Sequence, residues 1–345
     1  MRFSVLVPVY NRPNEVGELL ESLSSQSFDD FEVIIVDDGS AVRCEEVCSS
    51  FSDRMPLHYF YKENSGPGQT RNYAAERAQG EYFLILDSDV ILPPDYLKNT
   101  ADELEREYAD AFGGPDRAHE SFTDLQKAIS YSMTSFFTTG GIRGGDKKMD
   151  KFYPRSFNLG VKADVFRALG GFSSMRFGED IDFSIRVFKG GYKCRLFPES
   201  WVWHKRRTDL KKFFKQVYNS GMARINLYKK YPESLKLVHL LPAVFTAGSL
   251  LCIVCAVLLA VFSFALSSPS LACWAAVCVA PILLYSLLVM VDSMVKNSSV
   301  KIGLLSVPAA FTQLWGYGLG FFHAWWSRCV RGGGETSAFS KTFYK

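Results

Sequence analysis

The first ninety positions of the chain alternate between short apolar runs and segments whose apolar residues recur every three or four positions. Four runs are mostly apolar over five to seven consecutive residues, at positions 3–9, 31–36, 57–61 and 82–86. Such runs are typical of parallel strands that are buried on both faces. The intervening segments 14–25 and 68–78 have helical spacing. This alternation predicts an α/β fold built on a doubly wound, mixed but mostly parallel sheet.

A second pattern begins near residue 240, where charged side chains disappear. Residues 240–291 contain no Asp, Glu, Lys, Arg or His. The stretch is long enough for two membrane-spanning helices of roughly 20 residues each, with a break at the Ser-Ser-Pro-Ser segment 267–270. A third uncharged run, 302–322, has the length of a span but is rich in Gly, Pro and Trp. It fits either a third span or a re-entrant or interfacial segment.

The two patterns divide the chain into four parts. The expected parts are an α/β domain at 1–204, a basic amphipathic juxtamembrane helix at 205–234, a membrane domain of two to three helices at 235–327 and a tail at 328–345. The basic segment combines lysines and arginines with aromatic residues at helical spacing. This composition suits an anionic membrane surface, and it also occurs on the exposed face of an ordinary helix.

The distribution of positive charge predicts the orientation of the chain. The loop 267–270 is uncharged, whereas Lys296 and Lys301 follow the second apolar run. Positive residues favour the cytoplasmic side, so we expect the loop outside and the α/β domain inside. The N-terminus has no apolar signal-peptide region and runs directly into the first strand pattern. The chain is therefore expected to be a multi-pass protein of the cytoplasmic membrane with its α/β domain in the cytoplasm.

Net charge and cysteine content argue against two other classes of protein. A formal net charge of +3 over 345 residues gives no general basis for binding nucleic acid. Of the eight cysteines, four lie inside the apolar stretch and the others are scattered. We expect them to be reduced and structurally inert, so the sequence predicts neither a disulfide framework nor a cysteine metal site.

Polar side chains gather where the predicted strands end. Tyr10 follows the first run. Asp37 and Asp38 follow the second run, and Asp87 and Asp89 follow the fourth. In doubly wound sheets the ligand lies beyond the carboxyl ends of the strands. Two carboxylates at one strand end can hold a hard divalent cation that also binds phosphate, although Asp is common in plain turns as well.

Three further segments have the composition of binding or catalytic sites. Residues 64–68 are a glycine-rich loop before a helix that carries Arg71, which fits either a phosphate site or a capped loop. Glu179 and Asp180 belong to a cluster of three carboxylates, which fits a general base and also an ordinary acidic first turn of a helix. His204 follows a strand-like run and is either a metal ligand or a structural histidine.

Five short motifs occur in order along this part of the chain. They are Val-Pro-Val-Tyr-Asn at 7–11, Val-Asp-Asp-Gly-Ser at 36–40, Gly-Pro-Gly with Arg-Asn at 66–72, Leu-Asp-Ser-Asp at 86–89 and Gly-Glu-Asp-Ile-Asp at 178–182. In order and spacing they resemble glycosyltransferase family 2, whose members have the GT-A fold, and the likeness covers residues 1–230. The resemblance implies an inverting transferase that uses a nucleotide-diphosphate sugar, usually a uridine diphosphate sugar, with Mg²⁺ or Mn²⁺.

The resemblance also implies roles for individual residues. Those expected to bind the nucleotide sugar are Pro8, Tyr10, Asp37, Asp38, Gly68, Arg71 and Asp87. Asp89 would hold the metal, with His204 as a further ligand. Asp180 resembles the catalytic base of the family, and Glu179 would lie beside it near the acceptor.

The chain departs from the processive members of this family, because it lacks their Gln-x-x-Arg-Trp motif and has few spans for a polymer channel. We therefore expect one sugar per encounter, transferred to a hydroxyl or phosphate of a membrane lipid or lipid-linked glycan. The alternatives are a processive polysaccharide synthase, a catalytically inactive nucleotide-sugar binder at the membrane and a nucleotidyltransferase. The sequence leaves the sugar and any homo-oligomer open. The glycine-rich segment 140–145 is either a lid over the site or an ordinary surface loop.

Overall fold

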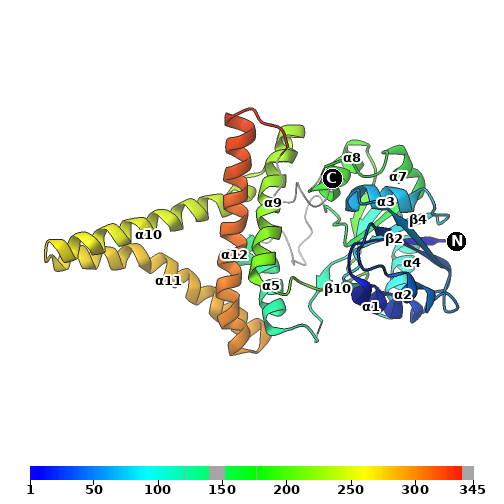
Figure 1. Ribbon diagram of the computed structural model, residues 1–345, viewed down its shortest axis with the longest axis horizontal. Coiled ribbons are helices and arrows are strands. Elements are labelled where there is room, and N and C mark those ends of the chain that lie inside the picture. The colour runs from blue at the N-terminus through cyan, green and yellow to red at the C-terminus, as the bar shows by residue number, and fades with distance from the viewer. Residues whose placement is uncertain (120, 140–151, 176, 336–345) are drawn as a thin grey trace. The chain divides into compact units, whose positions relative to one another are not determined.

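The computed structural model describes residues 1–119, 121–139, 152–175 and 177–335, so the predicted lid at 140–145 lies outside the described residues. The described residues form two compact units. One is an α/β domain made of residues 1–119 and 152–205, and the other is a helical unit made of residues 121–139 and 206–335 (Figure 1). The helical unit thus includes a segment from within positions 1–204, and the four-part division of the chain stays a prediction.

A seven-stranded sheet forms the centre of the α/β domain. Its strands are β1 (Phe3–Val9), β2 (Phe31–Asp38), β3 (Leu57–Lys62), β4 (Tyr82–Leu86), β6 (Ala111–Gly113), β8 (Asn158–Lys162) and β9 (Cys194–Leu196). They lie in the order β3-β2-β1-β4-β8-β6-β9. The pairings among β1, β2, β3 and β4 are parallel, whereas β8 runs antiparallel to both of its neighbours. The sheet is therefore mixed but mostly parallel, as predicted.

Helices cover both faces of this sheet (Figure 1). They are α1 (Pro13–Ser24), α2 (Glu45–Ser49), α3 (Pro67–Ala75), α4 (Tyr96–Arg106), α7 (Ala163–Ala168) and α8 (Glu179–Lys189). Successive side chains of a strand point to opposite faces, so both faces of β1 are covered. Val5 and Val7 belong to the core shared with α1, α2 and α4, and Leu6 belongs to the core shared with α3, α7 and α8. The doubly wound α/β fold is confirmed.

A second, three-stranded sheet has the order β5-β10-β7. Its strands are β5 (Val90–Ile91), β7 (Asp116–Arg117) and β10 (Val202–His204). β10 runs antiparallel to β5, and His204 pairs with Val90. This pairing brings a residue from the end of the domain next to the turn that follows β4.

The helical unit contains long helices. Its elements are α5 (Asp124–Thr134), α6 (Phe136–Thr139), α9 (Leu210–Lys230), the short η1 (Pro232–Ser234) and η2 (Leu237–Leu240), α10 (Leu241–Ala265), α11 (Pro269–Asn297), α12 (Val300–Trp325) and η3 (Trp326–Val330). α10 and α11 form a hairpin, and α12 packs along α9 and α5 (Figure 1). Among the described residues, the two segments Leu237–Ala265 and Pro269–Asn297 are long and apolar enough to cross a membrane.

Candidate active site

The carboxyl ends of β1 and β2 are joined through Asn11. The Asn11 backbone N–H donates to Ser40 Oγ at 2.8 Å, and Asn11 Oδ1 accepts the N–H groups of Ala41 and Val42 at 2.8 and 3.1 Å. Asn11 has a φ of 55°, a left-handed conformation that Asn tolerates better than most residues. These bonds hold the turns after the two strands at a constant spacing.

Asp37 stabilises the turn after β2 from inside the domain. Its side chain is fully buried and accepts the Ser40 N–H at 2.8 Å and the Tyr59 hydroxyl at 3.2 Å. The turn also depends on Gly39, which has a φ of 78° and whose added Cβ would lie 2.8 Å from Asn64 N. For Asp37 to accept a hydrogen bond from a nucleotide, this turn would have to rearrange.

Asp38 points the other way and organises the loop before α3. Its carboxylate accepts the N–H groups of Ser65 and Gly66, both at 2.9 Å, and forms an ion pair with Lys62. Asp38 is almost completely buried. It therefore connects the end of β2 to the glycine-rich loop that leads into Arg71.

The other expected donor residues lie near these turns. Tyr10 is 44% exposed and follows β1 directly, and Pro8 is half-buried within β1. Gly68 lies in the first turn of α3, where an added Cβ would contact Phe172 Cβ at 3.4 Å and Glu179 Cγ at 3.5 Å. The small residue thus lets α3 approach α8 closely.

Arg71 joins two of the predicted clusters. Its Nη2 donates to Asp87 Oδ1 at 2.7 Å, and its Nη1 donates to Glu179 Oε1 at 3.0 Å. The guanidinium is buried, so the two carboxylates supply the compensation that a buried cation needs. Arg71 therefore connects the end of β4 to the first turn of α8.

The first turn of α8 carries Glu179 and Asp180. Burial raises the pKa of Glu179 to about 7, with the negative charge of Asp180 adding to the shift and Arg71 opposing it. Asp180 Oδ2 lies 3.6 Å from Arg155 Nη1, and Asp180 Oδ1 accepts the backbone N–H of Ile181 at 2.8 Å. The helix start therefore holds one carboxyl group in contact with Arg71 and a second beside another arginine.

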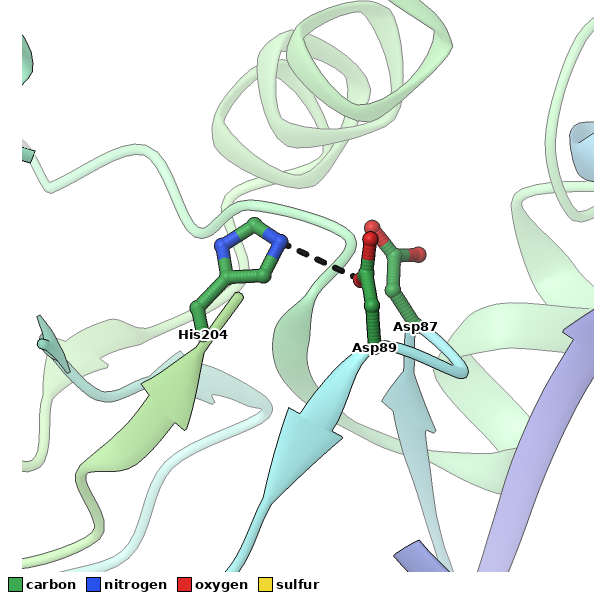
Figure 2. A group of neighbouring side chains, drawn as sticks. All are labelled: Asp87, Asp89 and His204. Carbon is green, nitrogen blue, oxygen red and sulfur yellow. Dashed lines mark ion pairs between the residues drawn. The ribbon is translucent and has the colours of Figure 1, made fainter. Parts of the chain in front are cut away.

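Asp87, Asp89 and His204 come together at one point (Figure 2). The three side chains offer ligand atoms that all lie within 4.8 Å of one another, and His204 Nε2 is 3.3 Å from Asp89 Oδ1. Two carboxylates and an imidazole suit Mn²⁺, and the carboxylates also suit Mg²⁺. The donor set therefore fits the divalent metal that the resemblance implies.

Several residues that the sequence did not single out surround this group. His204 Nδ1 is 3.9 Å from Asp116 Oδ2, and its ring stacks on Phe157 with centroids 4.7 Å apart. Arg12 forms an ion pair with Asp89. Arg12 could have been singled out from the sequence, because it directly follows the Val-Pro-Val-Tyr-Asn motif at the end of β1. Asp116 is 88 positions before His204, and nothing local in the sequence connects the two.

The chain resembles known glycosyltransferases in sequence. The profile of the family described as "Glycosyl transferase family 2" matches residues 4–168. The protein "Poly(ribitol-phosphate) beta-N-acetylglucosaminyltransferase TarS" of Staphylococcus aureus is 36% identical over 114 residues, which is 32% of this chain and 20% of TarS. An uncharacterized glycosyltransferase of Haemophilus influenzae is 30% identical over 195 residues, 54% of this chain and 62% of that protein. The matched part thus spans about a fifth of the length of TarS.

A solved structure of a mannosyltransferase has a similar fold. The mannosyltransferase PcManGT from Pyrobaculum calidifontis, in complex with GDP-Man and Mn²⁺, has a TM-score of 0.52 at 18% identity, over 91% of this chain and 87% of that chain. Residues 1–349 of S. aureus TarS in complex with UDP-GlcNAc have a TM-score of 0.48 at 20% identity, over 66% of this chain and 67% of that chain. The α/β domain has the GT-A type of fold. Most of this domain lies within the segment 4–168, which matches the profile of glycosyltransferase family 2.

Proposed function

We propose that the chain is an inverting glycosyltransferase that moves a sugar from a nucleotide-diphosphate donor, a uridine diphosphate sugar, to a membrane lipid or lipid-linked glycan. The observation that supports this most is the double contact of Arg71. Through Asp87 it reaches the predicted metal group, and through Glu179 it reaches the predicted acceptor side. The donor site and the catalytic base act in the same transfer step, so they must be held in a fixed position relative to each other.

Asp87, Asp89 and His204 are the residues that would hold Mg²⁺ or Mn²⁺. A divalent cation there supplies positive charge that stabilises the departing diphosphate. The chain adds positive charge of its own, because Arg12 contacts Asp89 and Arg71 contacts Asp87. Tyr10 and the turns after β1 and β2 would bind the nucleoside.

Asp180 is the proposed base. It takes the proton of the acceptor hydroxyl while that oxygen attacks the anomeric carbon from the face opposite the diphosphate. The new carbon–oxygen bond forms as the bond to the diphosphate breaks, so the configuration inverts. Arg155 lies beside the Asp180 carboxylate and helps to orient it. An acceptor phosphate would attack without this proton transfer.

The acceptor is proposed to be membrane-bound because of the helical unit. The most apolar parts of Leu237–Ala265 and Pro269–Asn297 are only 17% and 6% buried within the protein. A soluble protein rarely exposes apolar surface of this extent, whereas lipid covers it at no such penalty. An enzyme held in this way meets acceptors that are themselves in the bilayer.

The proposal is tested by incubating the purified full chain with Mn²⁺, a membrane-lipid extract and a panel of donors that includes UDP-GlcNAc, UDP-glucose and GDP-mannose. Product masses show which sugar moves, and a ladder of several sugars would indicate the processive alternative. Asp180→Asn should lower transfer to a hydroxyl by about 10²–10⁴-fold and leave donor binding close to wild type.

The matched control is Asp164→Asn, because Asp164 is an exposed carboxylate in the first turn of α7. This variant should transfer at the wild-type rate. If Asp180→Asn transfers sugar as fast as the control, Asp180 is not the catalytic base. A chain that binds a donor but neither transfers nor hydrolyses any member of the panel would instead be the inactive binder.

A further inference from the structure

One face of α12 packs along α9, and the two helices run side by side in the same direction. An added Cβ at Gly316 would lie 2.5 Å from Val217 Cγ2, and one at Gly320 would overlap the carbonyl oxygen of Tyr218. Further along, Arg328 Nη1 donates to Asn226 Oδ1 at 2.6 Å. Glycines at such positions let helix backbones approach closely. If α12 lies in a membrane, α9 must therefore lie at the same depth.

α9 is too charged to cross a bilayer. Its cationic residues occur from the first turn to the last and are Lys211, Lys212, Lys215, Arg224, Lys229 and Lys230. Lysine and arginine near the middle of a span are strongly disfavoured. The exposed lysines at both ends of α9 instead suit a helix that lies on an anionic surface. Because α12 packs along α9, α12 does not cross the bilayer either.

The opposite face of α12 is apolar and exposed. Leu304, Leu319, Phe322 and Trp326 are between 39% and 56% exposed and fall on one side of the helix at 3.6 residues per turn. Tryptophan is the residue that most favours the boundary between lipid headgroups and acyl chains. α12 has no charged face of its own, but together with α9 it presents one apolar and one charged side, as an interfacial amphipathic helix does.

The stripe lies on the side of α12 from which the α10–α11 hairpin extends. Trp315 Nε1 donates to Ser249 Oγ of α10 at 2.9 Å. The Phe311 ring lies 5.7 Å from the rings of both Phe245 in α10 and Tyr285 in α11. By helical spacing Phe311 and Trp315 lie on the same side of α12 as the stripe, where the hairpin covers them in part. The hairpin then runs across the direction of α12 and α9 (Figure 1).

We infer that α12 lies in the plane of the membrane, in the headgroup boundary of the leaflet from which the α10–α11 hairpin enters, and does not form a third span. The inference rests on the proposed membrane association. The bilayer covers the stripe Leu304, Leu319, Phe322 and Trp326, while α9 and α5 cover the other face. Residues 327–335 consequently stay on the side where the hairpin begins, in agreement with the positive charges of Arg328 and Arg331.

The inference is tested by measuring the depth of spin labels in vesicles of phosphatidylethanolamine and phosphatidylglycerol that contain the full chain. The labelled pair is Leu319→Cys and Trp326→Cys, seven residues apart on the stripe of α12. The matched control pair is Val244→Cys and Leu251→Cys, also seven residues apart, on one exposed face of α10. Cysteines of the helical unit are first replaced by alanine, at Cys252, Cys255, Cys273, Cys278 and Cys329.

Seven residues of a spanning helix correspond to a depth difference of about 10 Å. We expect that difference for the α10 pair, and equal, shallow depths for the α12 pair. A difference of about 10 Å in the α12 pair as well would show a third span and overturn the inference. Labels on α12 that contact only water would overturn it too. If both labels on α10 are in water, the helical unit is not inserted in the membrane and the premise of the inference is wrong. Sugar transfer measured in detergent would still test the proposed chemistry separately.

A second measurement does not depend on the labelled stripe. Cys329 is exposed just beyond α12, and a matched reporter is Ser270→Cys at the start of α11. In intact bacterial cells an impermeant maleimide should react with Ser270→Cys and leave Cys329 unmodified until the membrane is permeabilised. Labelling of Cys329 from outside the cell would overturn the inference.

Discussion

Arg71 links groups that look independent along the chain. The resemblance implies a nucleotide contact for this residue, whereas its guanidinium is buried between Asp87 and Glu179. Removing one partner of a buried ion pair is far more harmful than the pair is favourable. Substitutions at Arg71 would therefore disturb the donor side and the acceptor side together. The carboxylates Asp89 and Glu179 can be changed one at a time.

Asp89→Asn is expected to weaken Mn²⁺ binding by at least about 100-fold, since loss of a supporting residue alone costs roughly 10–100-fold. The carboxylate lies between His204 and Arg12, so the neutral amide removes both a ligand and the partner of Arg12. Free Mn²⁺ measured by electron paramagnetic resonance during titration gives the affinity. Asp164→Asn again serves as the control, and equal affinities in the two variants would exclude Asp89 as a ligand.

Glu179 should make stability depend on pH. Its pKa is raised from the ordinary 4.5 to about 7, chiefly by burial. A carboxyl group whose folded pKa is raised contributes stability that is fully present below pH 4.5 and is lost as the pH rises through about 7. The melting temperature of the wild type relative to Glu179→Gln should therefore fall between pH 4.5 and 7. Thermal scans of both proteins in detergent test this, and parallel curves would show that the group does not titrate there.

At the scale of elements, the pairing of α9 with α12 depends on glycine. Gly221 of α9 faces the carbonyl oxygen of Tyr317, and Gly316 and Gly320 of α12 face Val217 and Tyr218. In lipid the hydrophobic effect does not hold helices together, so close backbone contact becomes the main source of stability. The long apolar run 302–322 therefore contains small residues that contact α9 and large residues that are exposed.

Gly320→Ala is expected to destabilise the helical unit by about 1–3 kcal/mol, the usual cost of overpacking. The added methyl group would overlap the Tyr218 carbonyl oxygen, which belongs to the backbone of α9 and has little freedom to move. Gly248→Ala in α10 is the matched control, because nothing lies within 4 Å of its added Cβ. Thermal unfolding in detergent should show a lower midpoint for Gly320→Ala alone. Equal midpoints would mean that the two helices separate readily.

At the scale of the whole molecule, a water-soluble type of domain is joined to a unit with an apolar exterior. The α/β domain buries its cores on both faces of its sheet, whereas the α10–α11 hairpin exposes large apolar side chains along its length. Soluble proteins rarely expose apolar surface of this extent, so the hairpin supports the proposed membrane association.

The double variant Leu251→Lys with Leu258→Lys should prevent stable insertion of the chain into membranes. Both leucines are more than half exposed on α10, and a lysine in the middle of a span costs about 3 kcal/mol. Val42→Lys is the control, because Val42 is also exposed but lies in the α/β domain. Membrane fractionation after carbonate washing should release the double variant only. Retention of both proteins in the membrane would show that α10 does not cross it.

The sequence by itself determined the first four strands of the large sheet and the sheet edge at which the candidate site residues gather. Runs of apolar residues predicted β1 and β4 with their observed limits, because such runs can only be buried between two layers. The segments predicted as helices at 14–25 and 68–78 overlap α1 and α3. Carboxyl ends of parallel strands share one edge of a sheet, so Asp38 and Asp87 could be placed near each other without coordinates.

Only the tertiary structure decided which way each side chain points and which distant residues meet. Asp37 and Asp38 are neighbours, yet one is buried against Tyr59 and the other holds the loop at Ser65, because successive strand residues face opposite sides. Asp116 meets His204 because β7 and β10 pair in the small sheet. Composition left the run 302–322 ambiguous between span and interface. Its packing along the charged helix α9 is a three-dimensional relation, and no local pattern of residues contains it.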